Sequence, residues 1–98
     1  MIDLQNVQII GIRGDSEILR NLKVIYTTPQ GTVPFDRAFG IDISILDEPL
    51  NIAKGKLTVA YINQAKQYEP RVKVKEVSFA IDSENGTITP KVVVESGS

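Results

Sequence analysis

Two stretches of the chain repeat apolar residues at the spacing of an α-helix, and a proline follows each of them. In residues 16–28 one helical face collects Ile18, Leu19, Leu22, Ile25 and Tyr26. In residues 50–69 one face collects Leu50, Ala53, Leu57, Ala60, Tyr61, Ala65 and Tyr68. Pro29 and Pro70 end the two patterns because proline cannot continue a helix. We therefore expect two main helices.

The longer predicted helix carries a second apolar patch on its opposite side. Ile52, Val59 and Ile62 form this patch, with Gly55 beside it. A helix that is apolar on two sides is usually covered on both. The cover is either the N-terminal segment or a partner protein, and we favour the segment of the same chain.

Residues 71–95 show the two-residue alternation of β-strands. The apolar residues of the first half are Val72 and Val74 and then, on the opposite parity, Val77, Phe79 and Ile81. This change of phase at Lys75-Glu76 predicts a β-bulge. Asn85-Gly86 indicates the turn of a β-hairpin. Pro90 cannot donate a ladder hydrogen bond, so we expect it at a sheet edge or at a bulge.

The remaining segments are less regular. Residues 1–15 are interpreted as a strand around residues 7–10, followed by a turn, or as an arm. Residues 29–49 contain prolines and glycines but also Val33, Phe35, Phe39, Ile41, Ile43, Ile45 and Leu46. A loop this apolar is expected to pack against the core. Within it, Asp42 can cap a short helical turn through Leu46.

These elements predict a single domain over residues 1–98 with an α+β fold. We expect two main helices packed against a small antiparallel sheet with a C-terminal β-hairpin. The chain of 98 residues is long enough for one hydrophobic core and too short for two domains.

Composition narrows the functional classes. The chain has 11 basic and 12 acidic residues, a net charge of −1, which excludes a strongly basic nucleic-acid binder. It contains no cysteine and no histidine, which removes thiol and histidine catalysis and the commonest metal ligands. No apolar run reaches the roughly 20 residues of a membrane helix. The N-terminus lacks a signal-peptide pattern, so we expect export only inside a particle or by lysis.

Carboxylates are the remaining candidates for chemistry: Asp36, Asp42, Asp47, Glu48 and Glu69. Two carboxylates across a cleft would suit glycoside hydrolysis, but a domain of this size has little room for a polysaccharide. We instead expect these groups to cap helices and to pair with Arg or Lys. Residues 82–86 resemble a calcium loop only loosely and are interpreted as a turn. We therefore expect no catalytic residue, metal, cofactor or small-molecule substrate.

Two stretches hold an acid and an arginine in backbone that proline, glycine and aromatic residues stiffen. The first contains Asp36, Arg37 and Phe39, and the second is Glu69-Pro70-Arg71. Arginine binds carboxylates in a two-pronged geometry. The interpretation that the physics favours is an internal ion-pair network that pins the loop to the helix end. The other is a docking surface for another protein, and both can hold.

Four blocks follow one another at residues 22–31, 33–40, 47–49 and 69–72. They place a Thr-x-x-Gly and an Arg-x-Phe-Gly motif before a Glu-Pro-Arg triplet that follows a long helix. In this order and spacing, residues 16–95 resemble the baseplate wedge family of contractile phage tails. That family includes the gpW-type wedge protein and the equivalent baseplate subunit of type VI secretion systems. Residues 1–15 lie outside the resemblance.

The resemblance implies a non-catalytic structural subunit. Family members lie beside the central hub, contact the first layer of sheath and offer strands on which sheath polymerisation begins. The contact element of the family corresponds here to Glu69, Pro70 and Arg71. The implied partners are other baseplate wedge and hub proteins and the tail sheath protein, with no nucleic acid and no membrane. The implied location is the virion tail baseplate or a phage-like particle, after assembly in the host cytoplasm.

The alternative is a regulatory protein-binding module, because the same fold family includes a bacterial anti-adaptor that binds a proteolysis adaptor. A gene neighbourhood of sheath, tube and spike genes would favour the tail subunit, and an isolated stress gene would favour regulation. Some family members carry a lysozyme-like label. The lack of a credible acid–base pair argues against transferring that label to this chain.

Overall fold

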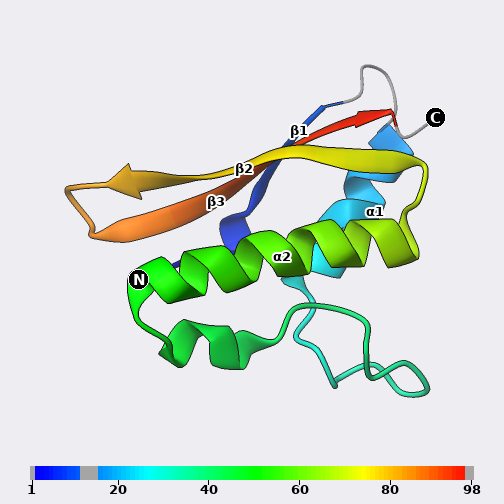
Figure 1. Cartoon of the computed structure of the whole chain (residues 1–98), viewed down its shortest axis with the longest axis horizontal. Coiled ribbons are helices and arrows are strands. Elements are labelled where there is room, and N and C mark those ends of the chain that lie inside the picture. Colours follow the sequence, from blue (N-terminus) through cyan, green and yellow to red (C-terminus); the bar gives the residue numbers. More distant parts are fainter. Residues whose placement is uncertain (1, 12–15, 97–98) are drawn as a thin grey trace.

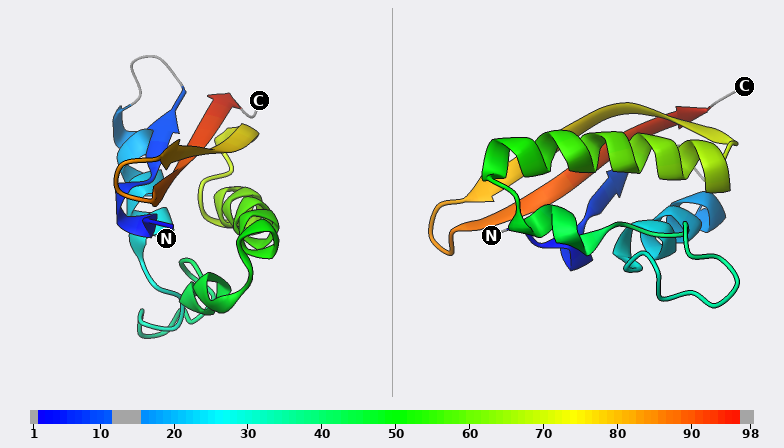
Figure 2. Two further views of the ribbon diagram at one scale, coloured as in Figure 1. Left: turned by 90° about the vertical axis from the view of Figure 1, so that its left-hand side faces the viewer. Right: turned by 60° about the horizontal axis from the view of Figure 1, so that its bottom comes forward.

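The computed structural model describes residues 2–11 and 16–96, which fold into two layers (Figure 1). The strands are β1 (Gln8–Ile10), β2 (Val72–Asp82) and β3 (Thr87–Ser96). The helices are α1 (Ser16–Thr27) and α2 (Leu50–Tyr68), with two short 3₁₀ helices, η1 (Leu4–Asn6) and η2 (Ile43–Asp47). Both main helices lie against the same face of the sheet, α1 beside β1 and α2 beside β2 (Figure 2). The predicted α+β fold class is confirmed.

The sheet is mixed, which corrects the expected antiparallel arrangement. Its strand order is β1-β3-β2; β2 and β3 form the predicted antiparallel hairpin, whereas β1 runs parallel to β3 with Ile9 opposite Val92. A parallel pair needs a long crossover connection, and here α1, α2 and β2 all lie between β1 and β3 in the chain. The path of this crossover decides whether β1 runs parallel or antiparallel to β3. A strand of three residues is too short for its own sequence to encode that direction.

The hairpin contains the predicted bulge. The register shifts between Val74 and Glu76, which leaves Lys75 without a partner in β3 and brings Val77 opposite Val92. Residues 82–86 form the predicted turn, which is longer than two residues, and Asp82 accepts the N–H of Gly86 at 2.8 Å through its carbonyl. The change of phase in the sequence and the bulge are therefore the same feature.

Pro90 lies in the central strand and is buried, so its expected position at an edge or bulge is wrong. The N–H of Asp3 donates to the carbonyl of Ile88 at 2.8 Å. The backbone groups of Ile88 and, two residues later, of Pro90 therefore face the N-terminal segment. The next ladder pair on that side is Gln8 with Lys91, and η1 leaves the ladder in between. The missing N–H of Pro90 thus faces a gap in the pairing.

The core lies between the sheet and the helices. α1 buries the predicted positions Ile18, Leu22, Ile25 and Tyr26. α2 buries Ala53, Leu57, Tyr61, Gln64 and Ala65. Leu50, which the pattern placed on this face, is 45% exposed. β3 and the N-terminal segment complete the core with Ile88, Pro90, Val92, Val94, Ile2, Leu4 and Val7.

The N-terminal segment is a strand that belongs to the fold, rather than an arm. Residues 8–10 pair with β3, and the residues before them contribute to the core. Most of the predicted turn after this strand, residues 12–15, lies outside the described residues.

The irregular segment between the helices is only partly packed. Ile41 and Ile45 are buried as expected. Phe35 is fully exposed, and Ile43 and Leu46 are about half exposed, so the expectation is wrong for these three side chains. η2 turns only one face, that of Ile45, toward the core, and the backbone of Phe35 in the preceding loop has a positive φ of 71°.

Candidate docking site

The Glu69-Pro70-Arg71 triplet forms the corner between α2 and β2. The buried carboxylate of Glu69 accepts two hydrogen bonds from Arg71, from Nε to Oε1 at 2.6 Å and from Nη2 to Oε2 at 2.8 Å. Nδ2 of Asn21 in α1 donates to Oε2 at 3.3 Å. The N–H of Val72 donates to the carbonyl of Glu69 at 3.1 Å, which closes the turn into β2. One carboxylate therefore joins both helices to the hairpin.

The corner keeps Glu69 ionised and holds Arg71 in a defined orientation. The hydrogen bonds from Arg71 lower the pKa of Glu69 below its usual value, although burial opposes them. The side chain of Arg71 is 53% exposed. A two-pronged arginine–carboxylate pair fixes geometry as well as charge. The exposed part of the Arg71 side chain thus lies at the surface, just before β2.

Tyr68 ties the irregular loop to the end of α2. Its hydroxyl donates to Oδ1 of Asp36 at 2.8 Å, and its ring packs edge-on against Phe39 with centroids 4.9 Å apart. Burial and the hydrogen bond to Asp36 both raise the pKa of Tyr68. Arg37 is exposed and forms no salt bridge with any residue that the structure describes. The predicted link between loop and helix end exists, but it passes through a phenol, and Arg37 takes no part in it.

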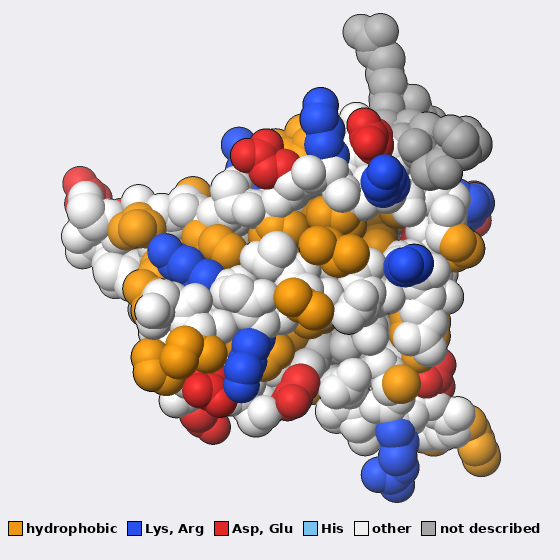
Figure 3. Space-filling view, viewed as in Figure 1, with side chains coloured by type: hydrophobic (Ala, Val, Ile, Leu, Met, Phe, Trp, Pro, Cys, Tyr) orange, Lys and Arg blue, Asp and Glu red, His pale blue; other side chains and the backbone are white. Residues whose placement is uncertain are grey.

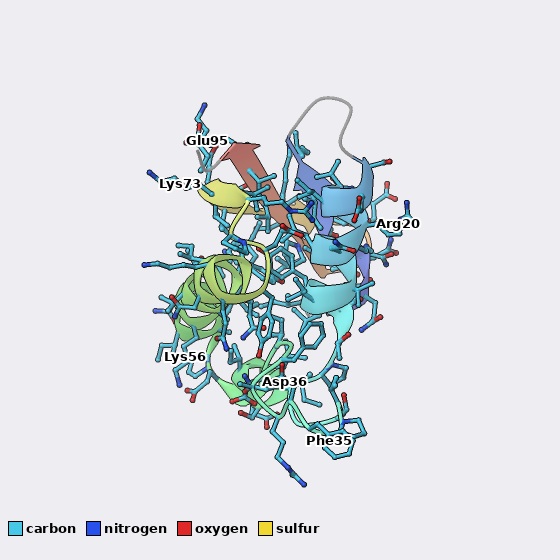
Figure 4. All side chains as sticks on the ribbon, turned by 90° about the vertical axis from the view of Figure 1, so that its right-hand side faces the viewer. Arg20, Phe35, Asp36, Lys56, Lys73 and Glu95 are labelled. Atoms are coloured by element: carbon cyan, nitrogen blue, oxygen red, sulfur yellow. The ribbon has the colours of Figure 1, made fainter. Side chains whose placement is uncertain are left out.

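Figure 4 shows that Asp36 and Phe35, which are adjacent in this loop, point in different directions. Asp36 lies on the inner side of the loop, toward the ends of the two helices, whereas Phe35 projects outward at the periphery of the molecule. The structure therefore brings Asp36 and Phe39 together at Tyr68, the residue that precedes the corner formed by Glu69 and Arg71. Pro70 lies exposed between the two charged residues of that corner.

Gln64 anchors the same loop, and sequence reasoning missed it. It is buried in α2, where its Oε1 accepts the N–H of Gly40 at 2.9 Å and its Nε2 donates to the carbonyl of Ala38 at 3.0 Å. Gly40 has a φ of +102°, and a Cβ at this position would overlap the carbonyl oxygen of Thr28. A glutamine three residues after Tyr61 on an otherwise apolar face was the available signal, since a buried amide requires partners.

The expected capping and pairing is confirmed for three of the five carboxylates. Glu69 pairs with Arg71, Glu48 pairs with Lys56 at 2.8 Å, and Asp42 caps η2. Two hydrogen bonds from Ser44 lower the pKa of Asp42. The bond from the hydroxyl has the larger effect, and the bond from the backbone N–H comes second. Among residues 2–11 and 16–96, no three acidic, histidine or cysteine side chains group together as metal ligands would.

The second apolar patch of α2 is open to solvent, so the expected cover by the N-terminal segment is wrong. Ile52, Val59 and Ile62 are between 42% and 57% exposed. The N-terminal strand instead pairs at the edge of the sheet that lies furthest from β2. Figure 3 shows apolar side chains on this exposed side of the molecule, separated by lysines and acidic residues.

Two grooves border the apolar patch. One lies between α2 and η2, has a volume of about 560 Å³ and is lined by Ile52 and Val59. The other lies between α2 and β2, has a volume of about 290 Å³ and is lined by Ile62, Val72 and Val74. The second groove runs beside the outer edge of β2, with which no described strand pairs.

Comparisons with known proteins leave the site geometry as the basis for a functional argument. No protein-family model, curated protein or solved structure matches this chain. In the part of the chain that the structure describes, neither helix has the length and apolar character needed to cross a bilayer.

Proposed function

We propose that this chain is a non-catalytic structural subunit in the baseplate wedge of a contractile phage tail or phage-like particle. It docks to neighbouring wedge and hub proteins and helps to initiate the tail sheath. The motif blocks within residues 16–95 suggest the family. The observation that carries the proposal is the open edge of β2, which a rigid corner orients. The proposed location is the tail baseplate, after assembly in the host cytoplasm.

The open edge of β2 supplies a mode of binding that needs little sequence specificity. An extended segment of a partner can add to such an edge through main-chain hydrogen bonds, while its side chains enter a neighbouring pocket. The backbone groups of Ile88 face away from β2, so those of its antiparallel partner Ile81 face outward, as do those of Phe79 and Val77. The groove beside Ile62 would receive alternate apolar side chains of the added strand.

The charges along this edge select among partners. Lys73 and Lys75 are exposed on β2, and the bulge at Lys75 interrupts its regular edge. Lysines and bulges on edge strands discourage indiscriminate pairing. They favour a partner strand that carries acidic residues, which is a selective contact rather than general aggregation.

The corner fixes where the added strand would begin. Arg71 precedes the first residue of β2, and its pairing with Glu69 orients the guanidinium. A carboxylate at the end of a partner strand would find this arginine next to the open edge. A symmetric tail repeats such a weak contact in several copies, so avidity holds one small subunit in place.

The proposal is tested by deleting the gene in its source strain and imaging the particles by electron microscopy. We expect the deletion to abolish sheathed tails and the wild-type gene to restore them. Ile81→Pro removes one outward N–H and no ladder bond, so we expect a folded protein that yields about tenfold fewer sheathed tails. Ile81→Val is the matched control and restores assembly. Normal sheathed tails from the deletion strain would refute the proposal.

Arg71→Ala tests the corner in the same assay. We expect the isolated variant to keep its circular dichroism spectrum while particle assembly is lost. A variant that is unfolded on its own would show that the triplet serves the fold alone. Arg71 would then no longer be proposed as a docking residue. The regulatory binding module stays a prediction, which an isolated stress-gene neighbourhood would favour.

A further inference from the structure

Phe35 is the most exposed large apolar side chain among the described residues, and its backbone is left-handed. Its exposure is 106% of that of the free residue, and its φ is +71°. A bulky residue at positive φ is uncommon, and such positions gather at functional sites. Within the described structure, the ring of Phe35 is not buried against any other part of the chain.

The loop around this ring is held in place by the rest of the molecule. Asp36 accepts the hydroxyl of Tyr68 at 2.8 Å. The side-chain amides of Gln30 and Gln64 both donate to the carbonyl of Ala38 at 3.0 Å. The aromatic ring is therefore a knob on a braced loop, and it projects outward in Figure 4.

The groove between α2 and η2 is lined by apolar side chains and can receive an aromatic ring. Ile45 lines the groove from η2, and Ile52, Gly55 and Val59 line it from one stripe of α2. Apart from its chain neighbours and the nearby backbone of α2 itself, no heavy atom lies within 4 Å of a Cβ placed on Gly55, so the middle of the stripe is open. A volume of about 560 Å³ is large enough for an aromatic ring.

The charges beside the knob and beside the groove are opposite. Arg37 is exposed two residues after Phe35 and forms no salt bridge with a described residue. Asp42 lies at the groove, exposed to solvent, while the other acid there, Glu48, is already paired with Lys56. Lys56 also lies close enough to lower the pKa of Asp42, but the two acids in the groove lining outnumber this lysine, so an arginine entering with the knob meets a net negative charge.

We propose that Phe35 of one copy inserts into the α2–η2 groove of a second copy, with Arg37 beside Asp42. Phe35 and Lys56, which lines the groove, point in different directions in Figure 4, so a chain does not fill its own groove. The knob and the groove are different surfaces of one copy, so a pair either exchanges both contacts or makes one of them, and in the second case further copies extend the array or close a ring. The inference does not depend on the tail assignment.

Sedimentation equilibrium on the full chain tests the inference. The contact is small, so we expect weak association with a dissociation constant of order 0.1–1 mM. Phe35→Asn removes the knob and suits the left-handed backbone. Gly55→Leu fills the groove and improves helix propensity. We expect each variant alone to be folded and monomeric over the range in which the wild type associates.

Mixing the two variants provides the decisive measurement. The Phe35→Asn variant offers an intact groove and the Gly55→Leu variant an intact knob, so an equimolar mixture is expected to form dimers and nothing larger. Higher salt is expected to weaken these dimers, because a charge pair contributes to them. A wild type that stays monomeric at about 1 mM, or a mixture that stays monomeric, would refute the inference. Association of both variants at wild-type strength would refute it equally.

Discussion

Tyr26 and Tyr61 pack against each other in the core, with ring centroids 4.6 Å apart. The hydroxyl of Tyr26 donates to the carbonyl of Tyr61 at 2.9 Å. The hydroxyl of Tyr61 is buried and has no hydrogen-bond partner among the described residues. Burial raises the pKa of both phenols. The two residues share their surroundings but differ in whether the hydroxyl is satisfied.

This difference predicts mutational effects of opposite sign. Tyr61→Phe is expected to raise the free energy of unfolding by about 1 kcal/mol, because it removes an unsatisfied buried hydroxyl. Tyr26→Phe is expected to lower it by about 1 kcal/mol, because it removes a buried hydrogen bond. Urea denaturation at neutral pH measures both variants against the wild type. Equal destabilisation by the two substitutions would contradict this assignment.

At the scale of elements, the molecule depends on one carboxylate at the end of α2. Glu69 holds Arg71 at the start of β2 and Asn21 of α1 at the same point. Its side chain is only 4% exposed, so its charge needs these partners. By contrast, the pair between Glu48 and Lys56 is exposed on both sides and stabilises little.

The corner makes stability depend on pH. The pKa of Glu69 is lowered in the folded chain from an ordinary value of 4.5, so its contribution is present above about pH 4.5 and is lost as the pH falls through the folded pKa. Arg71→Ala is expected to lower the free energy of unfolding by about 1–3 kcal/mol at pH 7, since the half-exposed arginine is partly screened. The difference from the wild type should shrink toward pH 3.

Urea denaturation between pH 7 and pH 3 measures this loss, and Lys56→Ala serves as the matched control on an exposed pair. We expect that control to change the free energy of unfolding by less than about 0.5 kcal/mol at every pH. A pH-independent effect of Arg71→Ala would mean that the arginine acts through packing rather than through the ionised carboxylate of Glu69.

At the scale of the whole molecule, the first residues of the chain close the core. Leu4 and Val7 are buried against the helices and the sheet. Nζ of Lys23 in α1 donates to the carbonyls of Gln5 at 3.1 Å and Val7 at 2.9 Å, so η1 is fastened to α1. Ile10, at the end of β1, is by contrast 45% exposed.

The N-terminal segment should therefore be as necessary to the fold as either helix. Leu4→Ala is expected to lower the free energy of unfolding by about 2–3 kcal/mol, because it leaves a cavity in the core. Ile10→Ala, an apolar truncation at the exposed end of the same segment, is expected to cost less than about 1 kcal/mol. Urea denaturation compares the two. Equal and small effects would show that this segment is dispensable.

Local patterns predicted the features that depend on neighbours in the sequence. The buried face of α1 follows from its 3.6-residue repeat, the cap of η2 from Asp42, and the bulge at Lys75 from the change of parity in β2. In the site, Glu69 and Arg71 were found because they flank a proline at a helix end. Each of these depends on the chemistry of a few adjacent residues.

Features that depend on contacts across the chain were missed or misplaced. Gln64 was not among the predicted site residues, although it holds Gly40 and Ala38 more than 20 residues away. Pro90 was expected at an edge or at a bulge, because its own strand gives no sign that η1 leaves the ladder opposite it. Such roles require knowledge of which segments meet in space.

The sequence by itself determined the α+β class, the two helices, the hairpin and the charged corner, because helix and strand periods and proline stops are local properties of the chain. The tertiary structure alone decided that β1 is parallel to β3, that the apolar patch of α2 is open and that Phe35 points into solvent. Parallel pairing and exposure depend on the path of a long crossover and on which surfaces remain after the core is filled. No local pattern in the chain records these outcomes.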